Sequence, residues 1–316
     1  MKIKTDYDHI NELYLVYPEG VKEESNHESH DYSCLTSLYD NLIQKVPSNI
    51  KIKLLVKSKA VAEEVRNNRS NMEVMVNSQL TSIWIRDWSG FSTGEKLFKP
   101  IFRPQYYWGE YHLADDINQA AYSLHSFMGV DMEELPLVLD GGNFVTNGKV
   151  SIITKRIIDD NWSLKGKEKE IEAVLWNKLK IKPIFINEME GEDTGHADGC
   201  IAFLSENDIA VSQYPDSWKE KDRKYVDSLA KLLRNEGFNV RRIIDVPQVP
   251  EEEPDGLFVN FLRLNNTILM PAYSHVGADE TEKNKNILSE YAEVITLNCD
   301  DLAAFGGVLH CISFTN

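Results

Sequence analysis

The chain has 316 residues, and its 34 basic and 50 acidic residues give a formal net charge of −16 at pH 7. A chain of this length can bury a substantial core without disulfides or structural metals. Because a nucleic-acid backbone is bound through clustered Lys and Arg, the surplus of acid argues against a nucleic-acid partner. It suits a small cationic substrate instead.

The sequence opens without the apolar segment of a signal peptide, and no run of about 18 apolar residues occurs in it. We therefore expect a cytoplasmic protein that does not span a membrane. The four cysteines, at positions 34, 200, 299 and 311, include no CxxC pair. Their spacing suits a reducing compartment and argues against a zinc finger.

The first predicted elements are a strand at residues 13–17, a helix at 35–46 and a strand at 51–56. Four β-hairpins follow, each made of two apolar alternating runs around a short polar turn. The turns are Gly94-Glu95, Asn147-Gly148, Asn207-Asp208 and Asn265-Asn266, spaced 53, 60 and 58 residues apart. The Asn-Gly turn is a strong hairpin signal by itself.

Each hairpin is followed by an amphipathic helix and one more strand. The helices are predicted at residues 113–127, 167–179, 216–235 and 279–291, and the strands at 135–139, 183–186, 240–246 and 294–297. A last strand, predicted at 308–314, would close a ring of five units by pairing with the first strand. Ring closure disposes of free sheet edges, whereas a linear array would need capping repeats. We therefore predict a single α/β domain over residues 1–316.

Residues able to carry chemistry lie just ahead of the hairpins. The segments are Trp84-Ile85-Arg86-Asp87, Asp140-Gly141-Gly142-Asn143, Gly195-His196-Ala197-Asp198 and Pro254-Asp255-Gly256, and the fifth unit contributes Gly306-Gly307 and Cys311. Equivalent positions in a ring lie at similar radii, so these side chains are expected to converge on one axis. Each also has a purely structural explanation, since Asp beside Gly often forms a turn and Cys in an apolar strand is often packing.

A Cys, a His and several carboxylates at one place suggest nucleophilic chemistry on a cation. Cysteine peptidases use a Cys and a His, but further acids would disfavour the thiolate through like-charge repulsion. A guanidinium substrate would explain the acids, because two carboxylates can hold its planar fork of donors. Held in this way, the guanidinium carbon would face the sulfur.

The ordered motifs, together with Gly-Gly-x-x-His-Cys at residues 306–311, resemble the agmatine deiminase and bacterial peptidylarginine deiminase family. The resemblance implies a five-bladed α/β propeller, the pentein fold, built of ββαβ units around a central active site. It implies that Cys311 is the nucleophile, His196 the general acid and base, and Asp87 and Asp198 the pair that holds the guanidinium. Neither a metal nor an organic cofactor is implied, and a homodimer is one expected form.

The same resemblance implies further substrate contacts. Trp84 matches a tryptophan that walls the substrate channel, Asp140 takes the place of an acidic residue near the site, and Trp108 belongs to a segment beside the pocket. Glu192 and Asp193, with Glu190 just before them, would suit the ammonium of agmatine. Arg103 would suit the carboxylate of an arginine substrate.

We therefore expect hydrolytic deimination through a thiouronium adduct, with agmatine converted to N-carbamoylputrescine as the favoured reaction. A peptidyl-arginine or free-arginine deiminase is the close alternative, an amidinotransferase or methylarginine hydrolase a more distant one, and a catalytically silent binding propeller the alternative from another class. Phe305 and Val308 stand where the family's agmatine enzymes usually have Gly and Asn, and Asp140 where Glu is usual. These departures affect the identity of the substrate more than the type of reaction.

Overall fold

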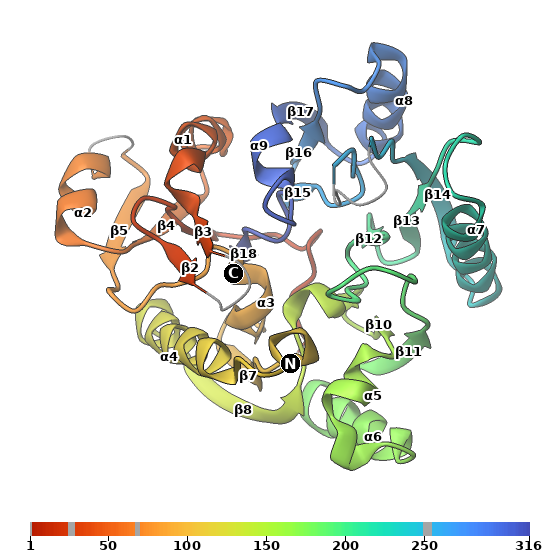
Figure 1. Ribbon diagram of the computed structural model, residues 1–316, viewed down its shortest axis with the longest axis horizontal. Helices are drawn as coiled ribbons and strands as arrows, with labels where there is room; N and C mark the ends of the chain where they lie inside the picture. The colour runs from red at the N-terminus through yellow and green to blue at the C-terminus, as the bar shows by residue number, and fades with distance from the viewer. Residues whose placement is uncertain (1, 25–28, 67–69, 249–254) are drawn as a thin grey trace.

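Five small sheets with their helices surround a common centre in the computed structural model, which describes residues 2–24, 29–66, 70–248 and 255–316. The units follow one another around the ring in chain order, and both chain ends lie near the middle (Figure 1). Pro254, from the motif predicted ahead of the fourth hairpin, lies outside the described residues.

Four of the sheets share one topology. Their strands are β6 (Phe91–Ser92), β7 (Lys96–Ile101) and β8 (Asp131–Val138); β9 (Val145–Thr146), β10 (Val150–Thr154) and β11 (Lys182–Ile186); β12 (Ile201–Phe203), β13 (Asp208–Gln213) and β14 (Asn239–Ile244); β15 (Leu262–Leu264), β16 (Thr267–Ala272) and β17 (Glu293–Asn298). In each sheet the first two strands pair antiparallel and the last two parallel.

Parallel pairing needs a crossover connection, and a helix supplies it in each of these four units. The crossover helices are α4 (Tyr111–Met128), α6 (Glu168–Leu179), α7 (Glu220–Asn235) and α8 (Ala278–Ser289). α4 shows why the sequence forms them: Ala114, Ile117, Ala121 and Leu124 are buried at a spacing of three and four residues. The four predicted ββαβ units are confirmed.

The fifth sheet joins the two ends of the chain. Its strand order is β18 (Phe314–Thr315), β1 (Glu12–Val16), β4 (Lys51–Val56) and β5 (Met72–Val76). β1 pairs antiparallel with β18 and parallel with β4, with α1 (Thr36–Lys45) as the crossover. The predicted ring closure and the five-unit propeller are thus confirmed. β5 and the preceding α2 (Lys59–Val65) were not predicted.

The remaining elements are short and lie between the units. They are the strands β2 (Lys22–Glu24) and β3 (Ser29–Asp31), the α-helices α3 (Ile85–Ser89), α5 (Arg156–Asp160) and α9 (Asp300–Ala303), and the 3-10 helices η1 (Tyr32–Leu35), η2 (Gln105–Tyr107), η3 (Gly141–Asn143) and η4 (Trp162–Leu164). β2 and β3 pair as an antiparallel hairpin.

The residues before β1 contact the hairpins of three different units. The amide of Lys4 donates to the carbonyl of Ser92, and the hydroxyl of Tyr7 donates to the carbonyl of Asn147 at 2.9 Å. The amide of Ile10 donates to Oδ1 of Asn265 at 2.8 Å. This N-terminal segment, residues 2–10, therefore ties units together that are far apart in sequence.

The predicted strand at 308–314 is wrong over most of its length, because only Phe314 belongs to β18 and the preceding residues form a turn. Within the turn, the amide of Ser313 donates to the carbonyl of His310 at 3.1 Å. The amide of His310 donates to the side chain of Asn260, and the carbonyl of Cys311 accepts from the amide of Arg86. The backbone polar groups here are satisfied outside a sheet ladder, so Cys311 lies in a turn.

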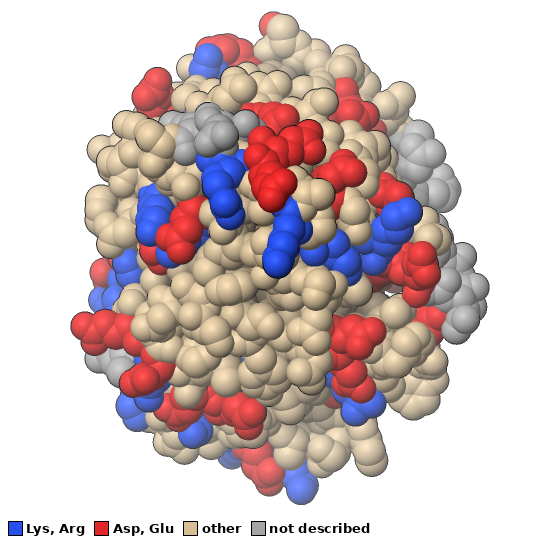
Figure 2. Space-filling model, turned by 90° about the vertical axis from the view of Figure 1, so that its left-hand side faces the viewer, with Lys and Arg blue, Asp and Glu red and all other residues tan. Residues whose placement is uncertain are grey.

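The outer surface carries mixed charge on the face shown in Figure 2, where Lys and Arg side chains alternate with Asp and Glu. Of the helices in the described ranges, none is both long enough and apolar enough to cross a membrane.

Replacing Phe314 with Ala tests the ring closure. The Phe314 side chain is buried, and its ring lies 5.7 Å from that of Tyr14 on β1. We expect Phe314→Ala to lower the free energy of unfolding by about 3–5 kcal/mol, because it leaves a cavity where the two chain ends meet. Urea denaturation followed by circular dichroism measures the change. Trp176→Ala, at a side chain that is 55% exposed on α6, is the control and should change it by less than about 0.5 kcal/mol; equal losses would contradict the expectation.

Candidate active site

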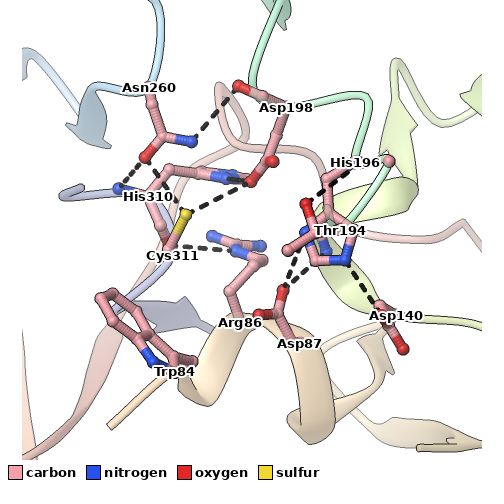
Figure 3. Close-up of polar contacts among 12 residues, drawn as sticks. Trp84, Arg86, Asp87, Asp140, Thr194, His196, Asp198, Asn260, His310 and Cys311 are labelled. Atoms are coloured by element: carbon pink, nitrogen blue, oxygen red, sulfur yellow. Dashed lines mark hydrogen bonds and ion pairs between the residues drawn. The ribbon is translucent and has the colours of Figure 1, made fainter. Parts of the chain in front are cut away.

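A cavity of about 530 Å³ lies where the five units meet. Seven of the predicted site residues line it, namely Trp84, Asp87, Glu192, Asp193, His196, Asp198 and Cys311. Figure 3 shows that the side chains of Asp87, His196, Asp198 and Cys311 come from different parts of the chain and point toward one another. The convergence predicted from the repeat is therefore present in the fold.

Cys311 lies among acceptors. Its Sγ is 4.0 Å from Oδ2 of Asp198 and 3.5 Å from Oδ1 of Asn260 (Figure 3). Burial and the negative charges of Asp198 and Asp87 raise the pKa of the Cys311 thiol well above its ordinary value. The sulfur is consequently a thiol while the site holds no cation, and a positive charge placed between the carboxylates would favour the thiolate.

His196 is held between two carboxylates. Its Nε2 lies 2.9 Å from Oδ2 of Asp140, and its Nδ1 lies 3.7 Å from Oδ1 of Asp87. Burial alone would lower the pKa of His196, but the charges of Asp87 and Asp140 outweigh it and raise the pKa to about 10. Burial also raises the pKa of Asp87 to about 7, against the opposing charge of His196. His196 is therefore an imidazolium at neutral pH and can donate a proton.

Asp140 contacts His196 rather than the cavity. Its Oδ2 also accepts from the hydroxyl of Tyr106 at 2.8 Å, and the side chain is buried and absent from the cavity lining. The glycines after it allow this close approach, since a Cβ on Gly142 would lie 2.5 Å from Nδ1 of His196 and 2.9 Å from Oδ1 of Asp87. Any larger residue at position 142 would displace the imidazole.

Asp198 is fixed on three sides. Its Oδ2 accepts from Nδ1 of His310 at 2.7 Å, and its amide donates to the carbonyl of Gly142 at 3.0 Å. Its own carbonyl accepts from Nδ2 of Asn260 at 3.2 Å. The carboxylate beside Cys311 is therefore held by residues from three other parts of the chain.

Aromatic side chains form one wall of the cavity. The indole N–H of Trp84 donates to the hydroxyl of Tyr32 at 3.3 Å, and the rings of Tyr32 and Phe305 lie 5.3 Å apart. Gly307 makes room for Trp84, because a Cβ there would lie 2.3 Å from the indole ring. This wall suits the methylene chain of a substrate.

The rest of the lining is strongly acidic. The acidic residues are Glu23, Asp87, Glu110, Glu192, Asp193, Asp198, Asp245 and Asp255. Among the described residues, the lining includes neither Lys nor Arg. The cavity is thus suited to a ligand that carries positive charge at more than one point.

The structure does not bring three other candidate residues to the cavity. The Trp108 side chain is 75% exposed and its ring lies 6.0 Å from that of Tyr111. The Arg103 guanidinium lies 4.4 Å above the Tyr111 ring, and the Glu190 side chain is 87% exposed. Tyr106, which is close to Trp108 in sequence, lines the cavity in its place.

Sequence reasoning missed several residues of the site. It singles out neither Asn260 nor Tyr106, and it includes His310 only as part of a motif. A signal for Asn260 was present, because it stands two residues ahead of β15, as Asn143 stands two residues ahead of β9. Comparing the two units could therefore have identified Asn260 as the equivalent of Asn143.

The protonation of His196 can be measured directly. We expect nitrogen-15 NMR to show both ring nitrogens protonated at neutral pH, with titration near pH 10, because two carboxylates stabilise the imidazolium. Asp140→Asn removes one of these charges and should lower the His196 pKa. The exposed His9 lies outside the site, and its nitrogen-15 signals should be the same in both proteins. A His196 that is neutral at pH 7 would contradict this view of the site.

Known proteins resemble this chain in both fold and sequence. A Campylobacter jejuni agmatine deiminase superposes with a TM-score of 0.83 at 20% identity, covering 100% of this chain and 95% of that one. A "putative arginine deiminase" from Porphyromonas gingivalis superposes with a TM-score of 0.78 at 19% identity, covering 100% of this chain and 98% of that one. These likenesses establish the pentein fold.

A curated Shewanella baltica protein named "Putative agmatine deiminase" is 26% identical over 236 residues, which cover 65% of this chain and 63% of the relative. The matched region thus spans less than two thirds of the relative's length. The family described as Porphyromonas-type peptidyl-arginine deiminase matches residues 3–316, nearly the whole chain. The chain belongs to that family.

Proposed function

We propose that this protein is a cysteine-dependent deiminase that hydrolyses the guanidinium group of a small substrate, with agmatine as the favoured one. The observation that best supports this proposal is that the sulfur of Cys311 lies 4.0 Å from Asp198 in a cavity lined by eight acidic residues. The names of the curated relatives and of the superposed C. jejuni enzyme support the choice of agmatine.

Binding of the guanidinium is the first step. Its N–H groups donate to the carboxylates of Asp87 and Asp198, which fixes the carbon over the sulfur. The positive charge of the guanidinium offsets the two carboxylates that keep Cys311 protonated, so the thiol loses its proton to solvent. Substrate binding and formation of the nucleophile are therefore coupled.

In the first half of the reaction a C–S bond forms and a C–N bond breaks. The thiolate of Cys311 adds to the guanidinium carbon and gives a neutral tetrahedral adduct. His196, an imidazolium, donates its proton to one amino group, which leaves as ammonia. A thiouronium cation on Cys311 remains, and His196 is now neutral.

The second half releases the product. Neutral His196 takes a proton from water, and the hydroxide adds to the thiouronium carbon. The C–S bond then breaks as the carbonyl forms, the hydroxyl proton is released, and the thiolate of Cys311 departs. Agmatine becomes N-carbamoylputrescine, a polyamine precursor, and neither a metal nor a cofactor takes part.

Agmatine fits the cavity better than arginine does because the residues around the bound guanidinium are acidic. An ammonium at the far end of the substrate meets acids such as Glu192, Asp193 and Asp255, whereas a carboxylate would be repelled. Arg103, the candidate partner for an arginine carboxylate, stacks on Tyr111 outside the cavity. The homodimer and the cytoplasmic location expected from the sequence stay predictions.

Replacing Cys311 tests the reaction type. We expect Cys311→Ala to release no ammonia from agmatine, since the variant lacks the thiol that the proposed mechanism places beside the guanidinium carbon. Agmatine should still raise the melting temperature of the variant, because the carboxylates remain. Cys34→Ala, at an exposed cysteine outside the cavity, is the control and should retain full activity. Ammonia release by Cys311→Ala would exclude the mechanism.

A substrate panel tests the choice of agmatine. We expect kcat/KM for agmatine to exceed that for free arginine by at least about ten-fold, because the acidic lining repels the α-carboxylate. Ammonia release from agmatine, free arginine and arginine-containing peptides at equal ionic strength measures the ratio. Faster turnover of the peptides would favour a peptidylarginine deiminase, and no turnover without thiol labelling by a haloacetamidine would favour a silent binding propeller.

A further inference from the structure

His310, the residue before the proposed nucleophile, bridges two carboxylates. Its Nδ1 lies 2.7 Å from Oδ2 of Asp198, and its Nε2 lies 3.3 Å from Oδ2 of Asp6. The His310 side chain is 11% exposed, so both contacts lie away from bulk water. A neutral imidazole has only one N–H, whereas an imidazolium can donate to both acceptors at once. This geometry indicates a buried imidazolium.

The charges around His310 support the same protonation state. Asp198 and Asp6 face its two nitrogens, and Arg86 is the cation nearby, with Nη2 3.3 Å from Oδ1 of Asp6. Burial and the charge of Arg86 act to lower the pKa of His310, but the two carboxylates outweigh them and raise it. Burial opposes ionisation of Asp6, yet His310 and Arg86 hold the pKa of Asp6 below its ordinary value.

Asp6 reaches His310 because a local turn and distant contacts hold the N-terminal segment. The amide of Thr5 donates to Oδ2 of Asp8 at 2.9 Å, and the amide of Asp8 donates back to the carbonyl of Thr5 at 3.1 Å. Tyr7, next to Asp6, is tied to the hairpin turn at Asn147. Asp6 therefore projects from a closed turn that is anchored to a second unit of the ring.

We propose that Asp6 and His310 are positioning residues for the deimination reaction, and that the N-terminal segment completes the active site by holding Asp198 in place through His310. The inference rests on the proposed function, since it assigns Asp198 to the guanidinium. His310 occupies one oxygen of Asp198 and restricts rotation of the carboxylate. Its positive charge also offsets the repulsion between Asp198 and the Cys311 thiolate.

The test separates binding of a cation by the carboxylates from the reactivity of the Cys311 sulfur. Chloroacetamidine is a planar cation that the carboxylates attract, whereas iodoacetamide is neutral, and both alkylate Cys311. The ratio of their rate constants for labelling of Cys311, followed by mass spectrometry, therefore reports how well Asp198 and Asp87 are placed. A general loss of structure would slow both reagents alike, so the ratio distinguishes positioning from folding.

Asp6→Asn is the primary variant, because Asp6 is 28% exposed and its amide isostere leaves the fold least disturbed. We expect Asp6→Asn to lower kcat/KM for agmatine and the chloroacetamidine to iodoacetamide ratio by about ten-fold each, since a charge-assisted contact is lost. His310→Asn, which retains a donor toward Asp198 but no charge, should show the same pattern. Asp6→Glu should recover part of both losses.

His9→Asn is the matched control, because His9 lies in the same N-terminal segment but its side chain is exposed. It should leave kcat/KM and the reagent ratio within about two-fold of the parent. Unchanged kcat/KM in Asp6→Asn, an unchanged reagent ratio in that variant, or an equal loss in His9→Asn would each overturn the proposal. If the parent releases ammonia from no guanidino compound, the proposed function fails, while the reagent ratio still decides whether Asp6 and His310 position Asp198.

Discussion

The antiparallel pairing of β1 with β18 is the constraint on which the site depends. It places Leu13 opposite Thr315 and Tyr14 opposite Phe314, and so joins the two ends of the chain. Cys311 lies a few residues before β18, and the N-terminal segment lies a few residues before β1. Both are thereby carried to the centre, where loops of the other four units already converge. A single long-range strand pair therefore sets the position of the sulfur relative to the carboxylates.

The second constraint is electrostatic. Carboxylates at Asp87, Asp140 and Asp198 lie in a buried region, where unpaired negative charge is costly. His196 and His310 each donate to these acids, but the number of acids around Cys311 still exceeds the number of cations. This region is therefore suited to bind a cation, and in the proposed reaction a guanidinium is that cation. Under the proposal, affinity for the substrate and ionisation of the thiol have one physical cause.

Much of this could be predicted from sequence because the repeat makes the same signals recur. Asn-Gly and related turns located the hairpins, and the residues ahead of them located Asp87, His196 and Asp198. The turn around Cys311 could not be predicted, since its apolar residues have strand propensity and the distant residues Asn260 and Arg86 hydrogen-bond to part of its backbone. Asp6 escaped notice because its partner is 304 positions away in the chain, at His310, and only the folded ring reveals the contact.

The late position of Cys311 in the chain has a consequence for biosynthesis. During translation the four complete ββαβ units emerge from the ribosome before the segment that carries Cys311. β1 therefore lacks its antiparallel partner β18 until that segment has emerged. Domains generally begin to fold from the N-terminus as they leave the ribosome. A nascent chain that has not yet reached Cys311 therefore holds the acids and the imidazole of His196 without the proposed nucleophile. Under the proposed mechanism it cannot form the thiouronium adduct, so deimination would require the last unit of the ring to have been made.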